Sequence, residues 1–414
     1  MKTYKNANYW FLSSYLFTFF VAWSLWWSFY AIWLKSKLNL SGQDIGFIYA
    51  ANSAAAMMFM IIYGILQDKL QTSKVVLTFQ SIIMIFIGPF MIYIYEPLLQ
   101  KHFILAVIIG APVLSAGFIS GCPLIESFVE RMSRLCHFEY GASRFWGSLG
   151  YAAATFVAGI VFSINPHINF WLSSIMGMIF LLVNWLFKPK VIVSVPADNT
   201  AKAVPAAIPT FQEIFSLYKL SKFWLFVLFI VGTFSFYTIY DQQLFPNFYT
   251  GFFSNTEVGY RVYGYLNSFQ VFLESSCMII APYFIYKIGA KRILLIAACI
   301  MITRIGLSAT MDNIYVISLL KLLHAIEIPL FVLAMFKYIV ANFDPRLSAT
   351  LYLVGFNISS NIGVIVLSTP VGKLFDKTSY STTFYVLAAI ILTVTAISAF
   401  TLSPKRDIQP VMTY

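Results

Sequence analysis

Three ionisable side chains stand at helical spacing within one strongly apolar stretch of the chain. Lys321, His324 and Glu327 lie inside the stretch from about Ile314 to Val340. At about 100° per residue, they fall within an arc of roughly 120° on one helix face. Inside a membrane such groups cost free energy unless they face a cavity or a partner. A basic group, a titratable imidazole and a carboxylate in series indicate proton handling.

A second pair of ionisable residues stands earlier in the chain. Glu126 and Arg144 each lie about a turn or more inside an apolar stretch, on what should be neighbouring helices. The two side chains can pair, and together they offer acceptors and a planar fork of donors to vicinal hydroxyls. A purely structural ion pair is the alternative interpretation.

The charges around the 321–327 group suggest which residue carries a proton. Asp241, Glu274 and Glu327 balance Lys321 and Arg304, so one carboxylate can be neutral by protonation. We expect Asp241 and Lys321 to form a structural pair. Arg304 close to Glu327 would favour the carboxylate and ease proton release, whereas a desolvated glutamate without that partner would hold its proton.

No metal or cofactor is expected. His324 and Glu327 would be two ligands at i, i+3 with no third ligand nearby. The loops contain no P-loop, dinucleotide fingerprint or hydrolytic motif, so we expect neither an enzyme nor an ATPase. Cys122, Cys136, Cys277 and Cys299 lack framework spacing and are expected to be free thiols.

The composition places these residues in a membrane. Of the 414 residues, 60% are hydrophobic and only 10% are charged, with a mean hydropathy of +0.79. An ordinary soluble domain carries about a quarter charged residues. Continuous apolar runs of about 20 residues recur along the chain, which excludes a single anchored domain and the alternating strands of a β-barrel. We therefore expect an all-α, multi-pass membrane protein.

Twelve transmembrane helices are predicted, in two groups of six. A polar, proline-containing segment at 188–220 separates 1–187 from 221–403 and is expected to be a flexible cytoplasmic linker. Residues 404–414 are expected to form a cytoplasmic tail. Two six-helix halves joined by a linker are typical of major facilitator transporters, whose site lies near the midplane between the halves. The predicted spans are 8–34, 43–66, 74–98, 103–132, 139–163, 167–187, 222–248, 258–286, 290–309, 313–341, 347–374 and 380–402.

The net charge of +11 also fits a membrane protein. Lys and Arg gather in alternate short loops, among them Lys69 and Lys74, Arg131 and Arg134, as the positive-inside rule requires. Both termini should therefore be cytoplasmic, and no nucleic-acid partner is expected.

The loop after the second predicted span carries a transporter-like pattern. Gly64, Asp68 and Lys69 fit the superfamily's G-x-x-x-D-[RK] loop, thought to latch the halves, although Gln71 stands where a glycine is usual. A weaker copy follows the eighth span at 287–292, and a basic turn that only obeys the charge rule is the alternative.

Aromatic residues line one face of the first predicted span. Trp23 and Trp27 lie well inside it, where their rings could pack on the C–H faces of a sugar. The alternative is an interfacial aromatic belt, which suits Trp33 near the outer end.

Several stretches resemble the oligosaccharide:proton symporters, the lactose permease group of the major facilitator superfamily, and the resemblance spans essentially the full chain. Within that group the chain is most similar to the sucrose-transporting members. The matching stretches are Tyr-Glu-Pro-Leu-Leu-Gln (95–100), His-Phe-Glu-Tyr-Gly (137–141), Asp-Gln-Gln-Leu-Phe-Pro (241–246), Tyr-Gly-Tyr-Leu-Asn-Ser-Phe-Gln-Val (263–271), Lys-Leu-Leu-His-Ala-Ile-Glu (321–327) and Leu-Ser-Thr-Pro (367–370).

This resemblance implies a role for each intramembrane charge. Glu126 and Arg144 match the group's sugar-binding pair. Arg304, His324 and Glu327 match its proton-coupling residues, with Glu327 the carboxylate that is loaded and unloaded. Asp241 and Lys321 match a mainly structural pair. Further candidates for sugar contact are Trp23, Trp27, Tyr151, Tyr237, Glu274 and Asn357.

Departures from the lactose-transporting members argue against β-galactosides. Tyr151 replaces the tryptophan that stacks on galactose, and Val271 replaces a sugar-binding glutamate, with Glu274 one turn later. Thr238 and Ser360 stand where a second Asp–Lys pair is expected. Because both charged residues are replaced, neither is left buried without its partner. Glu126 stands where an aspartate is expected in sucrose transporters, which could change how the sugar is held.

We therefore expect a monomeric proton-coupled importer of a disaccharide in the bacterial inner membrane, with sucrose as the favoured sugar. Its partners would be the sugar, the proton as coupling ion, and the lipid bilayer. Symport of melibiose, raffinose, maltose or lactose remains open, as do a proton-independent facilitator and a non-transporting sugar sensor.

Overall fold

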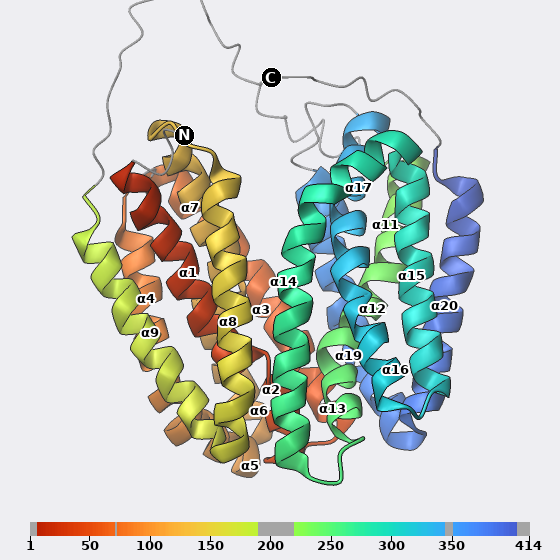
Figure 1. Cartoon of the computed structure of the whole chain (residues 1–414), viewed down its shortest axis with the longest axis horizontal. Helices are drawn as coiled ribbons and strands as arrows, with labels where there is room; N and C mark the ends of the chain where they lie inside the picture. The colour runs from red at the N-terminus through yellow and green to blue at the C-terminus, as the bar shows by residue number, and fades with distance from the viewer. Residues whose placement is uncertain (1–5, 71–72, 189–218, 344–350, 404–414) are drawn as a thin grey trace, which may run out of the picture. The chain divides into compact units, whose positions relative to one another are not determined.

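The structure is a computed structural model that describes residues 6–70, 73–188, 219–343 and 351–403 (Figure 1). The predicted tail and nearly all of the predicted linker lie outside these ranges. Every regular element in the described ranges is helical, which confirms the all-α prediction.

Within the described ranges, twelve helical segments are long and apolar enough to cross a membrane, and they follow the predicted spans closely. The start of the eleventh predicted span falls partly on residues outside the described ranges. The segments are Ala7–Ser36, Gly42–Gln67, Val75–Lys101, Phe103–Leu135, Tyr140–Ile164, Pro166–Leu186, Ser221–Thr250, Thr256–Ile288, Ala290–Thr310, Ile314–Asn342, Gly355–Lys377 and Tyr380–Thr401.

The chain divides into two compact units. The first holds the described residues of Met1–Ile192, Asp241–Phe272 and Ser368–Lys377, and the second holds those of Val193–Tyr240, Leu273–Leu367 and Thr378–Tyr414. The predicted halves follow chain order, whereas this division follows packing, so the halves stay a prediction.

The first unit contains the first six spans and parts of three later ones. Its elements are α1 (Ala7–Trp27), α2 (Tyr30–Ser36), α3 (Gly42–Leu70), α4 (Val75–Pro89), η2 (Phe90–Tyr95), α5 (Glu96–Lys101), α6 (Phe103–Leu114), η3 (Ser115–Ile119), α7 (Gly121–Leu135), α8 (Tyr140–Ile164), α9 (Pro166–Leu186), most of η5 (Tyr240–Leu244), α13 (Phe245–Thr250), the first part of α14 (Thr256–Ile288) and the end of α19 (Ser359–Lys377).

The second unit contains most of the last six spans. Its elements are α11 (Ser221–Ile230), η4 (Val231–Ser235), α12 (Phe236–Ile239), the rest of α14, α15 (Ala290–Thr310), α16 (Ile314–Leu322), α17 (His324–Asn342), η7 (Leu351–Ile358), most of α19 and α20 (Tyr380–Thr401).

The η elements are π-helical turns. They interrupt the third, fourth and seventh spans and begin the described part of the eleventh. A π-helical turn carries an extra residue per turn, so it shifts the face on which later side chains lie, and such turns are frequent at functional sites. The seventh span has two of them, on either side of the single turn of α12. Helical periodicity alone therefore misplaces side chains in this span.

The tenth span breaks into α16 and α17 at Leu323. Pro329, six residues further along, offers no N–H to the carbonyl of Ala325 and crowds it, which favours an irregularity in this region. The predicted tenth span is confirmed as one membrane-crossing stretch, Ile314–Asn342, in which Leu323 keeps helical dihedrals, although the 321–327 group is divided between two helical elements. Lys321 lies on α16, whereas His324 and Glu327 lie on α17.

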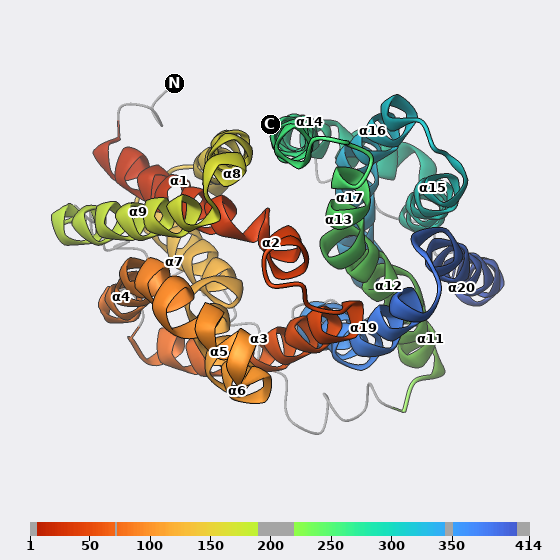
Figure 2. The same ribbon diagram turned by 90° about the horizontal axis from the view of Figure 1, so that it is seen from below.

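Within the first unit, α1 packs against both α8 and α9, and Figures 1 and 2 both show it beside them. On its other side α8 meets the first part of α14 without any side chain between the two backbones. A Cβ atom on Gly159 would lie only 2.9 Å from the Cα of Gly264. Both positions therefore require glycine for this close approach.

The C-terminal end of α19 caps the N-terminus of α3 in the same unit. The Asp376 carboxylate accepts hydrogen bonds from the backbone N–H groups of Gly42, at 2.7 Å, and Gln43, at 2.8 Å. A Cβ on Gly372 would lie 2.0 Å from the Gly42 carbonyl oxygen, so the backbones touch here too. An anionic group at a helix N-terminus satisfies open N–H donors and complements the helix dipole.

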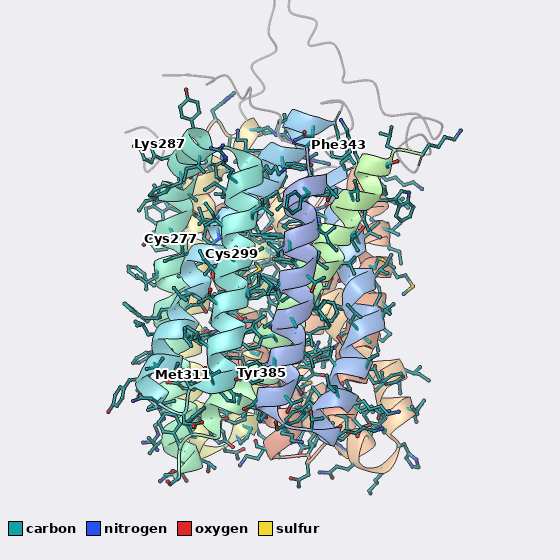
Figure 3. All side chains as sticks on the ribbon, turned by 90° about the vertical axis from the view of Figure 1, so that its right-hand side faces the viewer. Cys277, Lys287, Cys299, Met311, Phe343 and Tyr385 are labelled. Atoms are coloured by element: carbon teal, nitrogen blue, oxygen red, sulfur yellow. The ribbon has the colours of Figure 1, made fainter. Side chains whose placement is uncertain are left out.

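In the second unit, α15 packs against α17 and α20. Figure 3 shows Lys287 and Phe343 toward one end of these helices and Met311 toward the other, as expected for spans that alternate in direction. Large apolar side chains are exposed along the spans, including Leu392 and Phe400 on α20. Such a surface is expected to face lipid.

A lysine caps the last span of each group of six. The Lys74 ammonium donates to the carbonyls of Asn184, at 2.5 Å, and Phe187, at 2.6 Å, at the end of α9. The Lys291 ammonium donates to the Leu402 carbonyl at 2.6 Å, at the end of α20. Burial lowers the pKa of Lys74, helped by the charge of Lys188.

The basic loops therefore contribute helix caps. In the proposed latch loop, Lys69 is exposed and the space around Gly64 is open, while the side chain of Asp68 lies outside the described part of the structure. The latch itself stays a prediction.

Replacing Lys74 by methionine should destabilise the protein, because two carbonyls at the end of α9 lose their donor. A cation at a helix C-terminus contributes about 0.3–1 kcal/mol, which corresponds to a drop in Tm of at most about 2–4 °C. The measurement is thermal unfolding of the purified protein. Lys69→Met, an exposed lysine in the same loop, is the matched control and should leave Tm unchanged; equal shifts in both variants would contradict the cap.

Candidate functional site

The first unit holds a half-exposed ion pair. Glu126, on α7, and Arg144, in the second turn of α8, lie with Oε1 and Nε 2.6 Å apart. Their side chains are 29% and 33% exposed, so a molecule from solution can reach them. The structure brings together the two residues that the sequence predicted to pair.

Three neighbours fix the Arg144 guanidinium. The Phe20 ring lies beneath it, with Cζ 4.5 Å from the ring centroid. Nη1 donates to the Ser148 hydroxyl at 3.2 Å. A guanidinium held by a carboxylate, a ring and a hydroxyl is pre-oriented, so less conformational entropy is lost when it binds a ligand.

Aromatic rings continue from Phe20 along α1. The Trp23 ring lies 6.0 Å from Phe20, 6.1 Å from Trp27 and, perpendicular to it, 6.3 Å from Tyr151 on α8. Trp23, Trp27 and Tyr151 are each partly exposed. A partly exposed aromatic wall beside a few polar groups is the usual lining of a small-molecule site.

The second unit holds an ion pair that is fully buried. Arg304, on α15, and Glu327, on α17, lie with Nη1 and Oε1 2.8 Å apart, and both side chains are 0% exposed. Oε2 of Glu327 is buried and has no hydrogen-bond partner within the described ranges. The contact is therefore made through a single carboxylate oxygen.

The Tyr237 hydroxyl, on α12, joins this pair. It contacts Oε1 of Glu327, Nη1 of Arg304 and, at 2.5 Å, Nδ1 of His324. Nη1 of Arg304 also lies 3.0 Å from Nδ1 of His324. Because a guanidinium can only donate, Nδ1 must accept, and a neutral His324 then carries its proton on Nε2.

Glu274 lies on the far side of the imidazole. Its Oε2 is 3.8 Å from Nε2 of His324, and its side chain is 21% exposed. Tyr237 and Glu274 were predicted to contact sugar, and the structure places both within the Arg304–Glu327 cluster. Their role toward a sugar stays a prediction.

Three further residues predicted from the sequence, Asn357, Lys321 and Asp241, lie in the described part of the structure. Asn357 lies on η7, half-buried, and its backbone carbonyl accepts from Ser360 and Asn361. Lys321 is buried on α16, whereas Asp241 belongs to the first unit. The Asp241–Lys321 pair therefore remains a prediction.

The sequence reasoning missed Phe20, Ser148 and Tyr240. Phe20 precedes Trp23 by three residues, Ser148 follows Arg144 by four, and Tyr240 follows Tyr237 by three. Helical spacing from residues already chosen was thus the available signal. The guanidinium Cζ of Arg304 lies 5.4 Å from the Tyr237 ring and 5.2 Å from the Tyr240 ring.

The arrangement suits binding and proton transfer. In the described part of the chain, no three His, Cys, Asp or Glu side chains gather in a way that could hold a metal ion. All four cysteines are free thiols, as predicted.

The twelve apolar spans found in the described ranges define a multi-pass membrane protein. A solved structure of the nucleoside transporter NupG shares the fold, with a TM-score of 0.78 at 17% identity, covering 95% of this chain and 99% of that one.

The chain belongs to the LacY proton/sugar symporter family, whose model matches residues 1–413. It is 50% identical over 404 residues to the sucrose permease of Escherichia coli, covering 98% of this chain and 96% of that protein. It is 35% identical to the raffinose permease of Escherichia coli, covering 98% and 95%, and 35% identical to the lactose permease of Klebsiella oxytoca, covering 94% and 92%. The protein is therefore a proton-coupled sugar symporter of the inner membrane and not an enzyme.

Replacing Arg144 by alanine should weaken sugar binding strongly, because the ligand loses the planar donor fork and Glu126 loses this ion-pair partner. We expect a loss of affinity of about 100-fold or more, since charge-assisted hydrogen bonds to a site of this kind contribute roughly 1.5–3 kcal/mol each. Binding of labelled sugar to membranes measures it, with the amount of protein determined by immunoblot.

Arg134→Ala is the matched control for this variant. Arg134 is exposed and pairs only across one helical turn with Glu130, at 2.8 Å. It should bind sugar normally. Normal affinity in Arg144→Ala would remove that residue from the sugar site.

Proposed function

We propose that the sugar is sucrose and that the two ion pairs divide the work of symport. The reachable Glu126–Arg144 pair would bind the sugar, and the sealed Arg304–Glu327 pair would carry the proton. The observation on which this depends is the contrast in exposure between the two pairs, 29–33% against 0%.

Sugar recognition is proposed to combine hydroxyl binding with ring stacking. Arg144 and Glu126 offer donors and acceptors to vicinal hydroxyls, and Tyr151, Trp23 and Trp27 offer aromatic faces beside them. Two features support sucrose over a galactoside. The relative at 50% identity is a sucrose permease, and a tyrosine stands at position 151, where the galactoside transporters are expected to carry tryptophan.

Glu327 is proposed to be the residue that takes up and releases the proton. It is fully buried, its Oε2 has no hydrogen-bond partner within the described ranges, and its Oε1 faces a permanent cation. A proton can therefore be added at Oε2 without breaking the contact at Oε1. Tyr237 and His324, which reach the same carboxylate, are proposed to connect it to Glu274 and the partly exposed part of the cluster.

One proton per sugar would be sufficient for accumulation. Each positive charge moving inward releases about 2.3 kcal/mol per 100 mV of membrane potential. Because 1.4 kcal/mol corresponds to a tenfold concentration ratio, accumulation of tens-fold is within reach.

We propose that both termini lie in the cytoplasm. We also propose that the protein acts as a monomer. Twelve spans return the chain to the side on which it begins, and the basic residues of loops such as that holding Lys74 follow the positive-inside rule.

A panel of sugars should identify the substrate. If sucrose is carried, unlabelled sucrose will compete best against labelled sucrose uptake in cells lacking their own permeases, ahead of lactose, melibiose, raffinose and maltose. A relative at 35% identity is named for raffinose, which makes raffinose the most informative competitor. A stronger effect of raffinose or melibiose than of sucrose would reassign the sugar and leave the transport class unchanged.

Glu327→Gln should abolish uphill accumulation and leave sugar exchange intact, because glutamine resembles the protonated side chain and cannot release a proton. Accumulation of labelled sucrose and exchange across loaded vesicles are compared at equal protein amounts. Glu130→Gln, a change of the same type in an exposed pair, should leave both activities unchanged. Undiminished accumulation in Glu327→Gln would rule out this carboxylate as the proton carrier.

A further inference from the structure

The N-terminus of α3 receives its hydrogen-bond acceptors from two distant parts of the chain. Ser41 and Asp44 form a local capping box, in which the Ser41 hydroxyl accepts from the Asp44 N–H at 3.0 Å and donates to the Asp44 carboxylate at 2.6 Å. The Asp376 carboxylate, at the end of α19, accepts from the N–H groups of Gly42 and Gln43. We call these last two hydrogen bonds the outer clamp.

The backbones of α3 and α19 touch along the turns next to the outer clamp. A Cβ atom on Gly42 would lie 2.8 Å from the Gly372 carbonyl oxygen, and one on Gly46 would lie 2.3 Å from the Ser368 carbonyl oxygen. The two helix ends therefore fit together closely. A group added at position 42 would push them apart.

The outer clamp can be released without leaving polar groups unsatisfied. Asp376 and Gln43 are exposed, so water can replace the hydrogen bonds to the carboxylate when the helix ends separate. The capping box of Ser41 and Asp44 stays with α3, so the start of the helix remains formed. The arrangement suits a contact that breaks and forms again in each transport cycle.

Other links between early and late spans lie at the same side of the membrane. The Asn247 amide donates to the Ala31 carbonyl at 3.0 Å, and Nε of Arg261 donates to the Ser163 hydroxyl at 2.9 Å. These residues lie toward the ends of the first, fifth and seventh spans and the start of the eighth, and all belong to the first unit. Because successive spans alternate in direction, these ends share one side with the outer clamp. Under the proposed topology, it is the outer side.

We propose that the Asp376 carboxylate holds the outer ends of the second and eleventh spans together and releases α3 when the transporter opens to the outside. This inference rests on the proposed topology and on the proposed import of sugar. In alternating access the two sides of the membrane open in turn, so contacts that join early and late spans at the outer side must break before sugar enters. The outer clamp makes two charge-assisted hydrogen bonds, each stronger than one between neutral groups.

The first test measures uptake of labelled sucrose into right-side-out vesicles. Asp376→Ala should lower the apparent KM for sugar outside by about tenfold, because loss of the two hydrogen bonds raises the share of protein that is open to the outside. Gly42→Ala should lower this KM too, since its Cβ would press on the Phe375 ring and the Gly372 carbonyl. Damage to the fold would instead raise KM or lower the maximal rate.

Two controls separate the outer clamp from ordinary helix capping. Ser41→Ala removes the local acceptor at the same helix start and leaves the contact with α19 in place. Gln43→Ala keeps the backbone N–H that Asp376 binds. Both should keep the KM of the unmodified protein. An equal fall in KM with Ser41→Ala and Asp376→Ala would attribute the effect to capping and overturn the proposal.

Distances between two spin labels test the structural step without any sugar. The labels are attached to Lys101→Cys and Lys373→Cys, at exposed positions on the outer ends of α5 and α19, with the four native cysteines replaced by alanine. Asp376→Ala should enlarge the population with the longer distance. Unchanged distances and unchanged KM in both Asp376→Ala and Gly42→Ala would overturn the outer clamp. Absence of uptake in the unmodified protein would instead refute sucrose import, and the distances would still decide the role of Asp376.

Discussion

The organisation of the second unit depends on one buried contact, between Nη1 of Arg304 and Oε1 of Glu327 at 2.8 Å. Removing two ions from water costs several kcal/mol for each, and loss of one partner typically costs about 3–5 kcal/mol. The surrounding helices must therefore deliver compensating groups to both ions. Tyr237 and His324 supply polar atoms to these ions, and the Tyr240 ring lies beside the Arg304 guanidinium. Ser308 on α15 contacts only the Tyr240 hydroxyl in this group.

The same pair of residue types, glutamate and arginine, occurs in opposite environments in the two units. In the first unit the Glu126–Arg144 pair is reachable, so a ligand with hydroxyl groups can exchange bonds with it. In the second unit the pair has no solvent access, so a proton is the species whose arrival changes it. Under the proposed division of work, burial and not chemical identity would determine which substrate each pair handles.

The spans and the pairing of Glu126 with Arg144 and of Arg304 with Glu327 could be predicted from the sequence. Hydropathy sets the length of each span, and isolated charges in apolar stretches must find partners. The break at Leu323 and the π-helical turns around Tyr237 could not be predicted, because they depend on tertiary packing. For the same reason the sequence assigned Tyr237 and Glu274 to sugar contact, without indicating their contacts with His324.

The cap that Asp376 places on α3 has a genetic consequence. Its two donors are backbone N–H groups, at Gly42 and Gln43, and every residue except proline supplies such a group. The exposed Gln43 can therefore be replaced by many other residues without loss of the backbone hydrogen bond to Asp376. Both acceptors, in contrast, belong to one carboxylate. The contact is therefore encoded at Asp376 and at the two glycines, Gly42 and Gly372, where an added Cβ would clash, whereas position 43 tolerates change.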